Sequence, residues 1–212
     1  MPRHRESVGR TTAGIAMTMS ASTFAASDTF DRYGTGAIPS GWTAGVTGRG
    51  ESRWTVEADS SAPSRPNILK QSAVGDFSWA VRNGANVGNG YVEVKFKPIS
   101  GRQDRAGGVV WRWKNGDNYY VARANALENN VSLYYTEKGK RNTLQYVDAP
   151  VPLNAWHVLR VEFRDMRVRV LFNGKPYIDL EDGRISGEGL VGLWTKADSV
   201  TLFDDFAYGT SE

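Results

Sequence analysis

The stretch that decides the fold is "GGVVWRWKNGDNYYVARANALENNVSLYY", residues 107–135. Two runs rich in Val, Trp, Tyr and Ala flank the sequence "KNGD", and Asn-Gly between such runs is the strongest short-range signal for a β-hairpin. With Asn115-Gly116 at the tip, odd-numbered residues of the first strand share a face with even-numbered residues of the second strand. The pattern therefore predicts an antiparallel hairpin with two chemically different faces.

One face of this hairpin is apolar or small and is expected to pack against the core. It contains Val109, Trp111, Trp113, Tyr120, Ala122, Ala124 and Ala126. The other face contains Val110, Arg112, Tyr119, Val121, Arg123 and Asn125. Arginines on neighbouring strands repel each other, so we expect an anionic or polar partner between Arg112 and Arg123.

The chain alternates apolar and polar residues from Phe30 onward. The segments at 91–98 and 157–165 place Val, Leu and Phe on one side and Lys, Glu and Arg on the other. Residues 167–180 do the same around Asn173-Gly174, and residues 189–209 supply two further strands. Turn signals recur, for example at Asn83-Gly84, and helical periodicity is absent. This pattern predicts an all-β fold, a sandwich of two antiparallel sheets.

Composition excludes several classes of site. The 212 residues contain no cysteine, which rules out disulfides, Cys-ligated zinc and thiol catalysis. Of two histidines only His157 lies in a strand pattern, where we interpret it as a structural residue. No apolar run reaches 18 residues, so we expect no membrane span. With no linker in the sequence, residues 27–212 are predicted to form a single domain.

Residues 1–26 have the order of a secretory signal: Arg3, Arg5 and Arg10, then small and mildly apolar residues, then small residues around Ala25. Such a leader predicts a secreted or periplasmic protein; the alternative is a disordered tail. Cleavage after Ala25 removes three Arg and one Glu, which lowers the net charge from +3 to +1. The basic isoelectric point is therefore poor evidence for nucleic-acid binding, and no nucleic-acid partner is expected.

The segment "GLWTKADS" adds to the polar hairpin face. Trp194, Lys196 and Asp198 share one strand face, and Glu128 lies in the turn after Asn125. Sugars stack their apolar ring faces on Trp or Tyr and bind Arg, Asn, Asp and Lys through their hydroxyls. The expected glycan-binding residues of a concave groove are Arg112, Tyr119, Arg123, Asn125, Trp194, Lys196 and Asp198. The alternative is an ion-pair network that braces the sheet.

The hairpin stretch, "NAWHVLRVEF", "VLFNGK" and "GLVGLWTKADSVTLFDDF" together resemble the laminin-G-like jelly rolls of the concanavalin A-like lectin/glucanase superfamily. Within it the chain is most similar to the bacterial domain family named for 3-keto-disaccharide hydrolase. The opening "FDRYGTGAIPSGW" extends the resemblance over residues 30–208. The resemblance implies two large sheets, a concave sugar-facing sheet and, often, a structural calcium. Asp205 and, second, Asp31 stand at the places that match the calcium ligands; the alternative is that these acids are solvated.

Retaining glucanases of this superfamily carry E-x-D-x-x-E on one strand, because two carboxylates must flank the scissile bond. In "EADSSA" Glu57 and Asp59 are present, but Ala62 replaces the second Glu. Laminarinase-type hydrolysis is therefore rejected. If the protein is an enzyme, Glu128 and Asp198 are the expected catalytic acids.

Three functional hypotheses remain at this point. The first is an exported carbohydrate-binding jelly roll with a glycan partner. The second is a hydrolase or lyase-like enzyme that acts on a glycoside, including a 3-keto glycoside. The third is a scaffold that binds protein on its sheet face.

Overall fold

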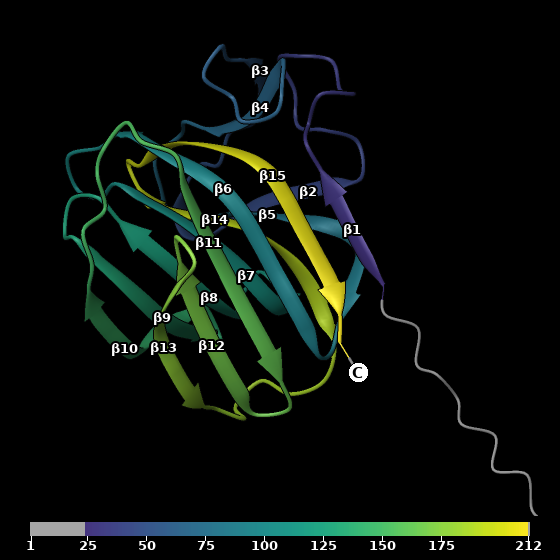
Figure 1. Ribbon diagram of the computed structural model, residues 1–212, viewed down its shortest axis with the longest axis vertical. Helices are drawn as coiled ribbons and strands as arrows, with labels where there is room; N and C mark the ends of the chain where they lie inside the picture. Colours follow the sequence, from purple (N-terminus) through teal and green to yellow (C-terminus); the bar gives the residue numbers. More distant parts are fainter. Residues whose placement is uncertain (1–23, 212) are drawn as a thin grey trace, which may run out of the picture.

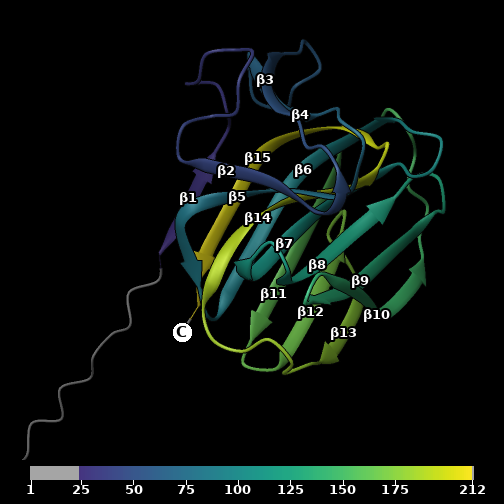
Figure 2. The same ribbon diagram turned by 180° about the vertical axis from the view of Figure 1, so that it is seen from behind.

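The computed structural model describes residues 24–211, which form fifteen β-strands arranged as two antiparallel sheets. Figure 1 looks onto sheet A, and Figure 2 shows the molecule from the side of sheet B. Within this described range there is no helix that is long and apolar enough to cross a membrane. The predicted all-β sandwich is thus confirmed.

Sheet A has eight strands. In spatial order it contains β13 (Lys175–Glu181), β12 (Arg167–Phe172), β11 (His157–Arg164), β6 (Gly90–Ser100), β15 (Val200–Thr210), β4 (Asn67–Gln71) and β3 (Trp54–Ala58), and β1 (Ala25–Asp28) also pairs with β15.

Sheet B has seven strands. In spatial order it contains β10 (Lys140–Asp148), β9 (Asn130–Glu137), β8 (Asn118–Asn125), β7 (Ala106–Asn115), β14 (Gly189–Ala197), β5 (Gly75–Val87) and β2 (Trp42–Gly50). The two strands predicted at 189–209 form as expected. They belong to different sheets, so the chain crosses from sheet B to sheet A after Ala197.

The main core lies between the sheets and follows from the alternation of the strands. Val92, Val94 and Phe96 of β6 are fully buried, while Glu93 and Lys95 are half-buried on the outer face of sheet A. Fully burying one such aliphatic or aromatic side chain contributes about 1.5–3 kcal/mol. The period-two pattern therefore both forms the strands and fixes which face each one buries.

Of the two turns predicted at Asn173-Gly174 and Asn83-Gly84, the structure contains only the first as a hairpin turn. Asn173 and Gly174 both have positive φ, 49° and 78°, which are the dihedrals of the tight turn expected between β12 and β13. The turn predicted at Asn83-Gly84 is wrong, because these residues lie inside β5. There Gly84 (φ 76°) helps the strand to bulge, and the partner of β14 jumps from Asn86 to Val81.

The predicted leader falls mostly outside the described residues, since residues 1–23 are not among them. The described chain shows that Ala25 pairs with Gly209 and Ala26 with Tyr208. The proposed cleavage after Ala25 would therefore cut within β1.

Candidate functional site

The β7–β8 hairpin has the predicted register up to Trp111, which pairs with Tyr120. Beyond this pair the register shifts, because Arg112 takes a left-handed backbone conformation with φ 46°. This bulge exchanges the faces of the next two residues. Trp113, expected in the core, packs instead with Trp79 on the outer face of sheet B, with ring centroids 5.1 Å apart.

Arg112 accordingly does not join the other predicted ligand residues. Its Nη1 donates to the carbonyl of Ile185 at 3.0 Å, and its Nη2 donates to the carbonyls of Gly88 and Asp165. The guanidinium lies 5.9 Å from the ring of Phe163, a core residue. Burial lowers the pKa of Arg112. The expected face of Arg112 is therefore corrected: the side chain ties three loops together at one end of the sandwich.

Six aromatic side chains form a second apolar cluster on the outer face of sheet B, which we call the aromatic face. They are Phe77, Trp79, Trp113, Tyr119, Tyr134 and Trp194. Phe77 and Trp194 stack with centroids 5.7 Å apart and 14° between their planes. Trp194, Tyr119 and Tyr134 have no exposed surface, whereas Phe77 and Trp113 are half-buried. The two half-buried rings are therefore the most exposed rings of this face.

A charged network lies beside the aromatic face. Arg123 donates to Asp104 Oδ2 and to Glu128 Oε2, both at 2.6 Å, and Lys196 Nζ is 3.2 Å from the same Asp104 oxygen. Arg123 and Asp104 are buried, and the Glu128 side chain is 40% exposed. Burial opposes the charge of Arg123, but Asp104, Tyr134 and Glu128 together outweigh this and raise the pKa of the guanidinium. The predicted ion-pair alternative is thus realised in part, around Arg123.

A further arginine covers the aromatic rings. The guanidinium carbon of Arg141, on β10, lies 4.2 Å from the ring centroid of Tyr134, 4.8 Å from that of Phe77 and 5.8 Å from that of Trp194. These distances permit cation–π attraction to several rings at once. Burial lowers the pKa of Arg141. Arg141 therefore closes the middle of the aromatic face.

The remaining predicted ligand residues of β8 lie on this same face but have structural partners. Tyr119 OH is 2.8 Å from Thr47 Oγ1, and burial raises the pKa of Tyr119. Asn125 Oδ1 accepts the backbone N–H of Leu127 at 2.8 Å and so stabilises the turn into β9. Arg123, Tyr119, Asn125, Trp194 and Lys196 are thus brought together by β8 and β14.

Asp198 leaves the face that its strand position predicts. Ala197 has φ 53° and the register of β14 shifts there, which turns Asp198 toward the loop before β7. Its carboxylate accepts the backbone N–H groups of Arg102, Gln103 and Asp104. Burial opposes ionisation, but these three hydrogen bonds outweigh it and lower the pKa of Asp198. Asp198 therefore fixes the loop that positions Asp104.

Glu128 is the other predicted catalytic acid. Burial disfavours its charge, but the Asn130 hydrogen bond and the nearby Arg123 and Lys196 outweigh this and lower its pKa. A general acid must still hold its proton near the working pH. The described surroundings of Glu128 and Asp198 thus favour the ionised form of both carboxylates.

The two predicted calcium ligands make separate contacts. Asp205 Oδ2 accepts Lys95 Nζ at 2.6 Å, and Asp31 Oδ1 accepts the backbone N–H of Asn67 at 2.9 Å. Among residues 24–211 no group of three or more His, Cys, Asp or Glu side chains is placed to hold a metal ion. Calcium takes six to eight oxygen ligands, which include backbone carbonyls as well as carboxylates, so the calcium expectation stays a prediction.

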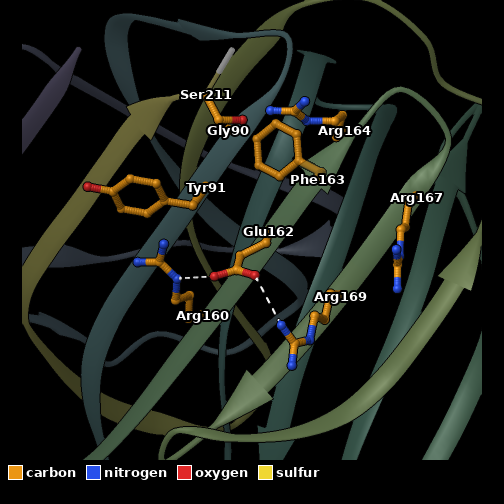
Figure 3. A pocket seen from close by; sticks show the side chains of 9 residues that line it. All are labelled: Gly90, Tyr91, Arg160, Glu162, Phe163, Arg164, Arg167, Arg169 and Ser211. Atoms are coloured by element: carbon orange, nitrogen blue, oxygen red, sulfur yellow. Dashed lines mark hydrogen bonds and ion pairs between the residues drawn. The ribbon is translucent and has the colours of Figure 1, made fainter. Parts of the chain in front are cut away.

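A hollow on the outer face of sheet A offers a contrast with the aromatic face (Figure 3). Here Arg160 lies 3.9 Å from the ring of Tyr91 and donates to Glu162 at 2.9 Å. Arg169 reaches the other oxygen of Glu162 at 3.7 Å. Arg160 and Arg169 in this hollow are therefore balanced by Glu162, on the same strand and the neighbouring strand respectively.

Sequence reasoning missed several residues of the aromatic face. Phe77 and Trp79 share the strand parity that pairs them with Lys196 and Trp194, so the alternation in "DFSWAV" was a usable signal. Asp104 is a single loop acid whose contact with Arg123 no local pattern indicates. Arg141 lies on β10, where a register shift at Thr143 obscures the alternation.

The chain matches no protein-family model and no curated protein sequence. Among solved structures it is similar to the carbohydrate-binding module CBM66 from Bacillus subtilis, with a TM-score of 0.65 and 22% identity over 80% of this chain and 94% of that one. It is also similar to the Bacillus licheniformis beta-glucanase, with a TM-score of 0.59 and 14% identity over 91% of this chain and 100% of that one. The chain has a jelly-roll fold.

A third jelly roll is the Bacteroides ovatus mixed-linkage glucan PUL GH16 in complex with its product. It has a TM-score of 0.59 and 9% identity over 86% of this chain and 98% of that one. At these identities the likeness establishes the jelly-roll fold and leaves the ligand to be argued from this chain's own residues. The predicted jelly-roll sandwich of two antiparallel sheets is confirmed.

Proposed function

We propose that this protein is an exported carbohydrate-binding domain that binds a glycan on the outer face of sheet B. The observation that carries the proposal is that half-buried Phe77 and Trp113 lie on the same face as Arg123, Asn125 and Lys196. Aromatic ring faces and charged or amide groups side by side suit the two chemical sides of a sugar. The jelly-roll likeness to a carbohydrate-binding module supports the same function.

Binding is favoured over bond cleavage by the state of the candidate acids. Asp198 accepts three backbone N–H groups and Glu128 accepts Arg123, and both pKa values are lowered. Glycoside hydrolysis by two carboxylates needs one of them protonated at the start. The alternative, an enzyme acting on a glycoside through Glu128 and Asp198, therefore has weaker support.

The test is a glycan array probed with the full chain, with each bound glycan then incubated and checked for product. We expect binding without product, and loss of binding in Phe77→Ala. Tyr91→Ala is the matched control, because Tyr91 also lies under an arginine but on sheet A. Product formation would support the alternative that the protein is an enzyme. Equal glycan binding by Phe77→Ala and Tyr91→Ala would show that the glycan does not bind at the aromatic face.

Two further parts of the proposal have their own measurements. Export is tested by fractionation of cells that express the full chain, where a mature form lacking the leader is expected outside the cytoplasm. A structural calcium is tested by the melting temperature with calcium and with a chelator. A rise with calcium would indicate a structural calcium site.

A further inference from the structure

On and beside the aromatic face, one cationic side chain, Arg141, forms no ion pair with a described acid. Arg123 and Lys196 pair with Asp104, and Arg123 also pairs with Glu128, so two cations face two carboxylates. No acid among residues 24–211 lies within ion-pair distance of Arg141. A half-buried guanidinium without an ion-pair partner is costly, and stacking on rings offsets only part of that cost.

The polar atoms that lack a hydrogen-bond partner on this face are mostly donors. Within the described chain these buried atoms include Arg123 Nε, Arg141 Nη1, Asn125 Nδ2 and the indole Nε1 of Trp79 and Trp113. Among the buried atoms of this face that can only accept a hydrogen bond, Asp104 Oδ1 alone lacks a partner. Buried donors normally find an acceptor.

A neutral sugar hydroxyl can donate as well as accept, so it would match a balanced set of groups. A carboxylate or a sulfate ester only accepts and carries negative charge, and it matches a donor-rich set with an extra guanidinium. The planar fork of Arg141 suits both anions, because it can donate two parallel hydrogen bonds.

We propose that the outer face of sheet B binds an acidic glycan, one bearing a uronic acid carboxylate or a sulfate ester, with the anion at Arg141. This inference rests on the proposed function and adds the chemical class of the ligand. The half-buried side chains of Phe77 and Trp113 would then contact the sugar, while Arg141 binds its charged substituent.

The experiment measures binding of the full chain to two matched pairs of polysaccharides. One pair is polygalacturonate and its carboxyl-reduced form; the other is a sulfated polysaccharide and its desulfated form. We expect at least about tenfold tighter binding to the charged member of one pair, and which pair responds identifies the anion. Arg141→Gln should lose that preference and keep any binding to the neutral form.

Arg160→Gln is the matched control. It removes the same formal charge from a ring-stacked arginine on the other sheet, so general attraction of polyanions to a basic protein would affect both variants equally. Should Arg141→Gln fold poorly by its melting temperature, Arg141→Lys keeps the charge but loses the planar fork, and we expect it to bind the charged form more weakly.

The outcomes separate the two proposals. If the protein binds charged and neutral forms equally, or if Arg141→Gln and Arg160→Gln behave alike, the acidic-glycan inference fails and carbohydrate binding stands. If neither the four polysaccharides nor any glycan of the array is bound, both proposals fail.

Discussion

Two arginines stack on aromatic rings on opposite outer faces of this sandwich, and they differ in how their charge is balanced. Arg160 on sheet A lies over Tyr91 and pairs with Glu162 at 2.9 Å and Glu93 at 3.4 Å. Arg141 on sheet B lies over Phe77 and forms no ion pair with a described acid, and Asp104 attracts it only from a longer distance. We propose that the missing ion pair, rather than stacking alone, distinguishes the binding surface.

The contrast extends to the whole of each face. The ion pairs on the outer side of sheet A join half-buried or exposed side chains across neighbouring strands, and such pairs typically contribute less than about 1 kcal/mol. The pair of Asp104 with Arg123 on sheet B is buried. Four predictions test this difference, from the largest expected effect to the smallest.

Asp104→Ala should lower the free energy of unfolding by about 4 kcal/mol, because it leaves the buried Arg123 guanidinium without its main counter-charge. Urea denaturation measures the change. Glu128→Gln removes the partly exposed partner of the same guanidinium and should cost less than about 1 kcal/mol. Equal effects of the two variants would mean that the network is as solvated as the pairs on sheet A.

Arg112→Ala should lower the free energy of unfolding by about 3 kcal/mol, since three loop carbonyls lose a charged donor. The same variant should bind glycans as the wild type does, because Arg112 lies away from the aromatic face. Thermal melting and the glycan array measure the two properties on one sample. If the variant is stable but binds glycans poorly, Arg112 takes part in ligand binding and the prediction is wrong.

Asp204 supplies a pH-dependent difference on sheet A. Burial raises its pKa to about 6, although Ser64 donates two hydrogen bonds to it. Because the folded protein holds this proton more tightly than the unfolded chain, stability is present at low pH and is lost as pH rises from about 4 to 6. Relative to Asp204→Asn, the wild type should lose about 2–3 kcal/mol between pH 4 and pH 7. Parallel stability curves for the two proteins would contradict this.

Arg167→Ala is expected to leave the urea midpoint unchanged. Arg167 forms a two-pronged ion pair with Asp179 at 2.8 and 3.0 Å, yet both side chains are exposed and screened by solvent. A clear loss of stability would show that sheet A also depends on its surface charges and would weaken the contrast.

The sequence predicted the sandwich, most strand positions and the β7–β8 register, because alternation directly records which face is buried. It also placed Trp194 and Lys196 on the face shared with Arg123. It misplaced Arg112, Trp113 and Asp198, since each lies at or just after a residue with positive φ that is not glycine. Such a bulge moves the residues that follow it to the opposite faces of the sheet. No residue type in "WRWKN" or "TKADS" predicts a bulge. Asp104 and Arg141 act through contacts between distant segments, which alternation cannot reveal.

Arg141 lies on β10, the outermost strand of sheet B, which is held by hydrogen bonds to β9 alone. Strands at such a border open locally more often than central strands do. We therefore expect the strand that carries Arg141 to exchange its amide protons earlier than the central strands of sheet B. Anchoring Arg141 to a bound anion would then also fasten the border strand, so that ligand affinity and local rigidity rise and fall together.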